Sequence, residues 1–350
     1  MAKVSLQRII NTNYVRYENL IPMINLAYAN SNADHINVYI DLYSIVKSLC
    51  NENVVIQDYS DFTSCIINMC SHYRAFFQSR YRTTSSFYIV NTLNKPSLNS
   101  KLFKGYNEKV DKLFHSKSMI MDMVANNIGL LKLLCQYLPD IYFIDRVSQE
   151  SAVVIFDLMC RDINNQQGHM IITKDKYLNR LCTMKPQTIV VRPKKKDSQD
   201  VSELITIFNI MNNYFEDKKV ATRSHLLSPD LLTHIMMLSG CKERNMESMF
   251  NISRVVKSLE KLVRDGIIPN RYTPDFQTVM TALSLEFDTP DIILGNRYKV
   301  LDIQYQHMVY INNPANIDYS LEIVNLVDND TVRDINNKYF ISNPLDLNRL

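Results

Sequence analysis

The stretch Ile36-Asn-Val-Tyr-Ile-Asp41, followed directly by Leu42–Leu49, decides the fold. Residues 36–40 form a short apolar run with β-branched members, which is typical of a buried strand, and Asp41 ends it. The apolar positions of 42–49 have helical spacing. A strand that leads through one acidic residue into a helix is the repeating unit of α/β proteins.

Three more apolar runs predict strands: Phe87–Val90, Ile141–Ile144 and Met170–Ile172. Long stretches with helical spacing separate these runs, and they cover 61–80, 107–138 and 149–164. Strands that alternate with helices favour a mostly parallel central sheet with helices on both faces. Ligands of such sheets bind beyond the carboxyl ends of the strands, where Asp41, Asn91 and Asp175 fall.

The pattern changes after a fifth predicted strand, Thr188–Val191. Helical spacing predominates in the segments Val201–Glu216, 229–239 and 252–265. Beyond Pro290 we expect short extended runs, at 298–303, 307–311 and 321–326. The sequence therefore predicts an α/β domain over 1–197, a helical domain over 198–282 and a small β-rich or irregular extension over 283–350.

Composition excludes several classes of protein. With 350 residues, 46% apolar and 21% charged, the chain resembles an ordinary globular protein rather than a disordered one. We find no apolar window for a membrane span and no secretory signal, so we expect no membrane partner and an intracellular location. The location would be the cytoplasm, or a virion or infected cell, since frequent Asn, Ile, Lys and Tyr suit an AT-rich viral or phage genome.

Cysteine spacing and net charge give no partner by themselves. The seven cysteines are odd in number and include no CxxC pair, which argues against a disulfide framework and a structural zinc site. A net charge of +3 is too small to indicate nucleic-acid binding, so that inference depends on where the charges lie.

The order of these elements resembles the flap endonuclease and 5′–3′ exonuclease branch of the PIN-like nucleases. The family's first strand, which ends in an aspartate, is similar to Ile36–Asp41. Its second, followed by a tyrosine and basic residues, is similar to Phe87–Asn91 with Lys104–Lys109, and Asn91 stands in place of the aspartate. The resemblance covers about residues 35–265 and implies this fold with a helix-three-turn-helix region in the helical domain.

The remaining family motifs are depleted of carboxylates. Glu150-Ser-Ala-Val153 resembles the third motif without its two aspartates, and Ile171–Leu178 resembles the fourth, with Asp175 kept and Tyr177 in the second aspartate's place. In the helix-three-turn-helix region, Cys241 and Arg244 stand where an aspartate pair would align.

The resemblance implies a metal site at the sheet edge. Two-metal phosphodiester hydrolysis needs several carboxylates, because Mg²⁺ and Mn²⁺ prefer oxygen ligands. The family's catalytic set carries over to Asp41, Glu150 and Asp175, which with the neutral ligand Asn91 would hold one Mg²⁺ or Mn²⁺. Almost no ligands remain for a second ion. The other interpretation is that the chain binds no metal at all. The acidic residues also suit helix starts, where carboxylates cap or oppose the helix dipole.

Two basic segments predict a nucleic-acid partner, DNA rather than RNA. Arg74 and Arg80 are interleaved with aromatic residues in 73–82, a combination that binds phosphates and stacks bases. Lys104 and Lys109 fall where the family's arch meets the strand that enters the site. Against binding, the family's glycine-rich hairpin would fall at 249–254, which contains no glycine.

The sequence thus favours a nucleic-acid-binding or structural protein with a flap-endonuclease-like fold and an eroded, inactive metal site. Proteins of a viral or replication assembly are further expected partners. The alternative is a divergent metal-dependent, structure-specific 5′ nuclease, and an unrelated α/β protein is a third class.

Overall fold

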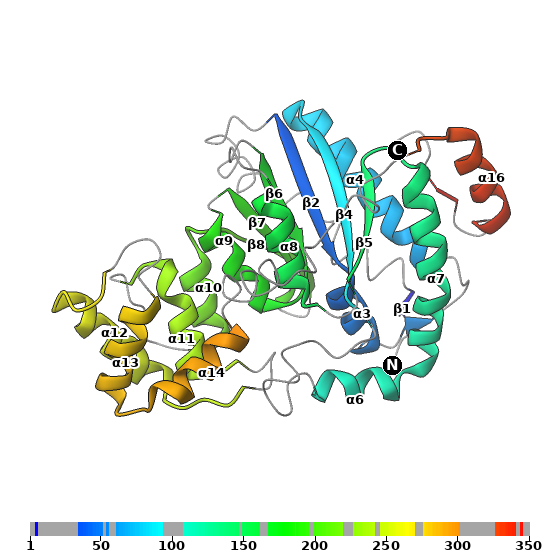
Figure 1. Cartoon of the computed structure of the whole chain (residues 1–350). Helices are drawn as coiled ribbons and strands as arrows, with labels where there is room; N and C mark the ends of the chain where they lie inside the picture. Colours follow the sequence, from blue (N-terminus) through cyan, green and yellow to red (C-terminus); the bar gives the residue numbers. More distant parts are fainter. Residues whose placement is uncertain are drawn as a thin grey trace, which may run out of the picture.

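A six-stranded sheet forms the centre of the computed structural model (Figure 1). Its order is β5-β4-β2-β6-β7-β8, and only β8 is antiparallel to its neighbour. The strands are β2 (His35–Asp41), β4 (Thr84–Asn91), β5 (Ile141–Asp145), β6 (Gly168–Ile172), β7 (Thr188–Lys196) and β8 (Gln199–Ile205). A separate parallel pair joins β1 (Val4–Ser5) to β3 (Val54–Val55). The predicted mostly parallel sheet is confirmed.

The structure describes fourteen segments of the chain. They are residues 4–5, 34–51, 54–55, 61–93, 108–146, 149–161, 167–185, 187–196, 199–219, 227–241, 246–269, 276–301, 326–340 and 344–345.

Alternate residues of the strands enter two hydrophobic cores, one on each face of the sheet. Val38 and Ile40 of β2 join one core, which α3 (Leu42–Asn51), α4 (Asp61–Tyr81) and α7 (Ser118–Tyr137) cover. Tyr39 joins the other core, where α8 (Ser151–Cys160) packs on the sheet. A short helix, α6 (Glu108–Ser116), adjoins α3.

A group of helices continues the second core away from the sheet, at the left of Figure 1. We call α10 to α14 the helical lobe, and the six-stranded sheet with its covering helices the sheet lobe. The members of the helical lobe are α10 (Ile210–Asp217), α11 (Leu232–Ser239), α12 (Ile252–Arg264), α13 (Phe276–Phe287) and α14 (Asp291–Leu301). The turns η3 (Lys176–Arg180) and η4 (Pro229–Leu231) and the short helix α9 (Leu181–Met184) connect the two lobes.

The helix predicted over Val201–Glu216 is wrong in its first part. Residues 199–205 form β8, whose Glu203 is the pairing partner of Arg192 in β7. The apolar residues Val201, Leu204 and Ile205 suit a helix by spacing, but Leu204 and Ile205 enter opposite cores, as neighbours in a strand do. The expected boundary at 197/198 therefore falls in the hairpin between two strands of one sheet.

The C-terminal part is helical where the structure describes it, which corrects the β-rich prediction. The run 298–303 was expected to be extended, but α14 covers it to Leu301, and α16 (Asn329–Tyr339) is a further helix. The run 307–311 lies outside the described residues, as does 321–325. Leu326 N donates to Gln136 O at 2.7 Å, so the chain returns to α7 of the sheet lobe.

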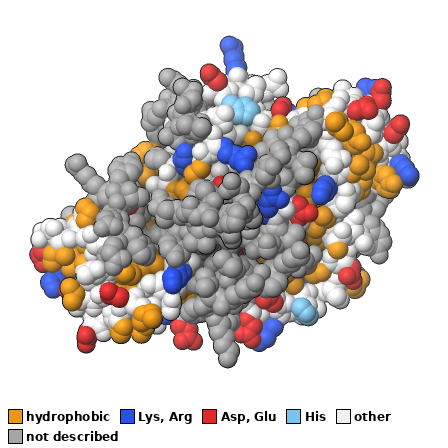
Figure 2. Space-filling view, viewed as in Figure 1, with side chains coloured by type: hydrophobic (Ala, Val, Ile, Leu, Met, Phe, Trp, Pro, Cys, Tyr) orange, Lys and Arg blue, Asp and Glu red, His pale blue; other side chains and the backbone are white. Residues whose placement is uncertain are grey.

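Helix α7 meets the length and hydropathy of a membrane span, which corrects the expectation that no window does. Its residues Met123, Val124 and Leu131 are buried in the first core, and α16 packs beside it. Hydrophobic side chains reach the surface over α7 and α16, at the right of Figure 2. The exposed ones on these two helices include Met119, Leu133 and Tyr339. The packing identifies α7 as a core helix of the sheet lobe.

Candidate functional site

Asp41 ends β2 at the carboxyl edge of the sheet and is completely buried. Thr173 Oγ1 donates to its Oδ2 at 2.8 Å, and Ser44 N donates to its Oδ1 at 3.3 Å. Burial, followed by the charge of Asp175, raises the pKa of Asp41 to about 6, although hydrogen bonds from Thr173, Ser151 and Ser44 oppose the shift. The folded protein therefore disfavours a negative charge at this position.

Asp175 lies beyond β6 at the same edge and is buried. Its Oδ1 accepts a hydrogen bond from Tyr177 N at 3.0 Å, which caps η3. Its own backbone N–H donates to Thr173 Oγ1 at 3.0 Å, so one threonine connects Asp175 to Asp41. Asp175 thus has the helix-capping role that the sequence allowed, and it also lies close enough to Asp41 to raise the pKa of that carboxyl.

Asn91 ends β4 and pairs with a carboxylate that the sequence analysis missed. Its Nδ2 donates to Asp145 Oδ1 at 3.0 Å, and its Oδ1 accepts from Leu93 N at 3.2 Å. Asp145 ends β5 as Asp41 ends β2. The motif of an apolar run that ends in aspartate was visible there too, but the predicted strand stopped at Ile144.

Glu150 lies at the start of α8, where its backbone is extended and it occupies the N-cap position. It is buried, and the adjacent Ser151 Oγ contacts Thr92 Oγ1 at 2.8 Å and hydrogen-bonds Asp41. The sheet therefore places Asp41, Asn91, Glu150 and Asp175 at one edge.

The described residues at this edge do not form an assembled two-metal centre. Within the described segments, no group of three or more His, Cys, Asp or Glu side chains is arranged to hold a metal ion. Both oxygens of Asp41 and the amide oxygen of Asn91 already accept hydrogen bonds from the protein. Hard divalent cations need several free anionic oxygens, so no catalytic step is assigned to a metal here.

The four basic residues predicted to bind nucleic acid are not found together in the described structure. Arg74 Nη2 donates to Pro139 O at 2.6 Å, and the guanidinium lies 5.5 Å from the centre of the Phe87 ring, so this arginine serves packing. Arg80 is exposed near the end of α4, at the amino edge of the sheet where β4 begins. Lys104 lies outside the described residues, and only the backbone of Lys109, in α6, is described.

A basic stripe on α12 was missed by the sequence analysis. Its exposed side chains are Arg254, Lys257, Lys261 and Arg264, at successive intervals of 3, 4 and 3 residues. The opposite side of the helix buries Val255, Val256, Leu259 and Leu262. The spacing alone would have revealed one positive face on an amphipathic helix.

Contacts with α13 hold two members of the α12 stripe. The guanidinium of Arg254 lies 5.0 Å from the ring centre of Phe250 and 5.4 Å from that of Phe287. Lys261 Nζ is 3.1 Å from Glu286 Oε2. The stripe therefore begins at an arginine positioned over aromatic rings.

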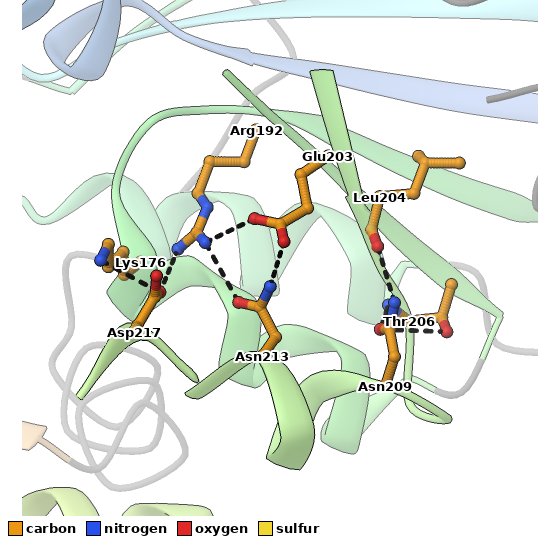
Figure 3. A network of polar contacts seen from close by, with 8 residues as sticks. All are labelled: Lys176, Arg192, Glu203, Leu204, Thr206, Asn209, Asn213 and Asp217. Atoms are coloured by element: carbon orange, nitrogen blue, oxygen red, sulfur yellow. Dashed lines mark hydrogen bonds and ion pairs between the residues drawn. The ribbon is translucent and has the colours of Figure 1, made fainter. Parts of the chain in front are cut away.

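A second charged cluster joins β7, β8 and α10 (Figure 3). Arg192 Nη2 donates to Glu203 Oε2 at 2.7 Å and Nη1 donates to Asp217 Oδ2 at 3.0 Å. Nη2 also donates to Asn213 Oδ1 at 3.1 Å, and Lys176 Nζ lies 3.0 Å from Asp217 Oδ2. We call these residues the Arg192 network.

Comparison with known proteins gives matches only among solved structures; no family model and no curated protein sequence matches the chain. The bacteriophage T5 D15 protein, crystallised with metal ions, has a TM-score of 0.54 at 9% identity, covering 80% of this chain and 94% of that chain. The T5 D15 flap endonuclease, as a pseudo-enzyme–product complex with DNA and metal ions, has a TM-score of 0.52 at 10% identity, with the same coverage. T5 5′-exonuclease with bound zinc has a TM-score of 0.51 at 11% identity, covering 81% of this chain and 94% of that chain.

Proposed function

We propose that this chain, which has the flap-endonuclease fold, binds nucleic acid without cutting it. The observation that carries the proposal is the small negative charge that Asp41 and Asn91 provide at the carboxyl edge of the sheet. Asp41 is buried with a pKa of about 6, and Asn91, on the neighbouring strand, is neutral. A carboxylate that the folded protein disfavours in its charged form and a neutral amide provide little of the negative charge that two dications require.

Chemistry at this edge is correspondingly limited. Two-metal hydrolysis stabilises both the attacking and the leaving oxygen, and the loss of one ion lowers the rate by on the order of a thousandfold or more. Thr173 and Ser44 occupy the oxygens of Asp41 with hydrogen bonds of the kind that stabilise a fold. We therefore assign the edge a structural role.

The α12 stripe supports binding. Its four cations lie between residues 254 and 264, a rise of roughly 15 Å along the helix, which matches the reach of several phosphates of a nucleic-acid backbone. Arg254, positioned over two aromatic rings, loses little side-chain freedom when it contacts a phosphate. One T5 structure with this fold is a complex with DNA, which agrees with a nucleic-acid ligand here.

Binding is tested by titrating labelled duplex, 5′-flap and single-stranded DNA, and RNA duplex, at several salt concentrations. The test variant replaces Arg254, Lys257, Lys261 and Arg264 with alanine. We expect a loss of at least tenfold in affinity and a salt dependence weaker by about 0.9 in slope for each lost contact with a DNA duplex. The matched control replaces four exposed cations elsewhere, Lys132, Lys299, Arg333 and Lys338, and should bind as the parent does. Equal affinity of parent and test variant would refute the α12 assignment, and no binding by the parent would leave a structural role.

A divergent metal-dependent 5′ nuclease is the second candidate, because four acidic side chains lie at the edge: Asp41, Asp145, Glu150 and Asp175. Cleavage of 5′-flap and single-stranded substrates with Mg²⁺ or Mn²⁺ decides between the two functions. We expect no cleavage above background by the parent or by an Asp41→Ala, Asp175→Ala double variant. Robust cleavage by the parent that the double variant abolishes would establish the nuclease instead.

A further inference from the structure

Arg180 is one of the largest completely buried side chains of the described residues, and only 2% of it is exposed. It ends η3 at the junction of the sheet lobe and the helical lobe, before α9. Its guanidinium lies 5.4 Å from the ring centre of Tyr177. Tyr177 is the residue that stands in place of an aspartate in the nuclease family that the sequence resembles. The arginine is therefore buried among the segments that connect the two lobes.

Within the described segments, Arg180 has no partner of opposite charge. None of the ion pairs in the described segments includes Arg180, and its Nε and Nη1 have no hydrogen-bond acceptor. Arg192, which is equally buried, contacts two carboxylates. A buried cation without compensation destabilises the fold, and a guanidinium does not lose its proton to avoid this cost.

His234, whose pKa is influenced by the charge of Arg180, does not supply the missing negative charge. Burial, and then the charge of Arg180, lowers the pKa of His234 in α11 to about 3, so this histidine is neutral at physiological pH. Its Nδ1 is already hydrogen-bonded to the hydroxyl of Tyr298 in α14. His234 is thus a neutral ring that does not compensate the charge of Arg180.

A second buried polar group lies beside the arginine. Asn179 Oδ1 has no donor within the described part of the chain, although Asn179 is only 6% exposed. Buried polar atoms without protein partners in folded proteins commonly bind water or an ion. Water alone would satisfy hydrogen bonds but would leave the positive charge uncompensated.

We propose that Arg180 binds a small monovalent anion, of the size of chloride, at the junction of the two lobes. The anion accepts hydrogen bonds from the guanidinium, and an accompanying water donates to Asn179 Oδ1. This site is independent of nucleic-acid binding and of the carboxyl edge. Its consequence is that the attachment of the helical lobe to the sheet lobe depends on anion concentration.

The first test measures the melting temperature of the parent in sodium chloride and in sodium gluconate at equal ionic strength. Gluconate is too large for an enclosed site. We expect a rise of about 2 °C for each tenfold increase in chloride above the dissociation constant, and none with gluconate. Identical melting curves in the two salts would overturn the proposal, and so would a shift with phosphate but none with chloride.

The second test locates the site with the line width of the chloride-35 NMR signal, which broadens when chloride exchanges with a protein site. The parent should broaden the signal, whereas Arg180→Met should not. Arg333→Met, in which an exposed arginine of α16 is replaced, serves as the matched control and should broaden it as the parent does. If Arg180→Met does not fold, Arg180→Lys keeps the charge without the planar group and should bind chloride more weakly. Equal broadening by the parent and the folded Arg180 variant would refute the assignment.

Discussion

The Arg192 network and the cluster at Asp41 both contain buried charges, but they are built in opposite ways. In the Arg192 network every charge has a partner of opposite sign: Arg192 with Glu203 and Asp217, and Lys176 with Asp217. At the sheet edge two carboxyl groups, Asp41 and Asp175, lie close enough for the charge of Asp175 to raise the pKa of Asp41. The Arg192 network therefore stabilises the fold, whereas the like charges at the sheet edge are tolerated at a cost in stability, as residues of a present or former functional site often are.

The largest loss of stability is expected when the ion pairs of Arg192 are removed. Arg192→Met leaves Glu203 and Asp217 without the guanidinium in a largely buried environment. We expect a loss of about 3–5 kcal/mol in the free energy of unfolding, measured by urea denaturation. Arg333→Met, which breaks only an exposed pair, should change it by less than about 0.5 kcal/mol. Similar losses for the two variants would show that the network does not hold β7 and β8 to α10.

The pH dependence of stability tests the other cluster. The pKa of Asp41 is raised from 3.8 to about 6, so folding favours its protonated form. The stability that this group contributes is fully present below about pH 4 and is lost as pH rises through 6. The loss amounts to about 3 kcal/mol, since one pKa unit corresponds to about 1.4 kcal/mol.

Asp41→Asn removes this titration and keeps the size of the side chain. We expect the variant to be up to about 3 kcal/mol more stable than the parent at pH 8 and nearly equal to it at pH 4, in paired urea titrations. A difference that does not change between these two pH values would show that Asp41 is not the titrating group.

Features that depend on local sequence patterns could be predicted from the sequence, whereas features that depend on contacts between distant segments could not. The strand with Asp41 and the helix after it are local patterns, and the predicted sheet and flap-endonuclease-type fold are confirmed. Pairing of β8 with β7 and the return of α16 to α7 depend on contacts between segments that local periodicity does not identify.

The segment 73–82 and helix α12 both contain several cations, but they differ in which side chains reach the surface. In 73–82 the aromatic residues Tyr73, Phe76 and Phe77 enter the first core, and Arg74 contacts Pro139 and Phe87. On α12 the cations alternate with apolar residues at helical spacing, which leaves all four exposed. Periodicity, rather than the presence of arginine and tyrosine, separates a solvent-facing stripe from a core helix.

Asn91→Asp tests the repulsion at the sheet edge by adding a fifth acidic side chain to the four that lie there. The new carboxylate would face Asp145 in place of the hydrogen bond that Asn91 Nδ2 now donates at 3.0 Å. We expect a loss of about 1–2 kcal/mol in the free energy of unfolding at pH 8, and a smaller loss at lower pH, where repulsion between like charges weakens. Mg²⁺ at millimolar concentration should restore part of the loss in melting temperature and leave the parent unchanged. An equal shift of the parent by Mg²⁺ would contradict the proposed absence of a metal site.

The smallest effect is expected at the outer end of the Arg192 network. Lys176 Nζ and Arg192 Nη1 are both 3.0 Å from Asp217 Oδ2, but the lysine side chain is 41% exposed and the arginine side chain only 3%. Water screens the lysine and replaces it when it is removed, so Lys176→Met should cost less than about 1 kcal/mol in urea denaturation. In the double variant with Arg192→Met, the lysine should matter more, because Asp217 then depends on it alone; the coupling between the two changes measures this. A cost for Lys176→Met as large as that for Arg192→Met would mean that burial does not rank these two cations.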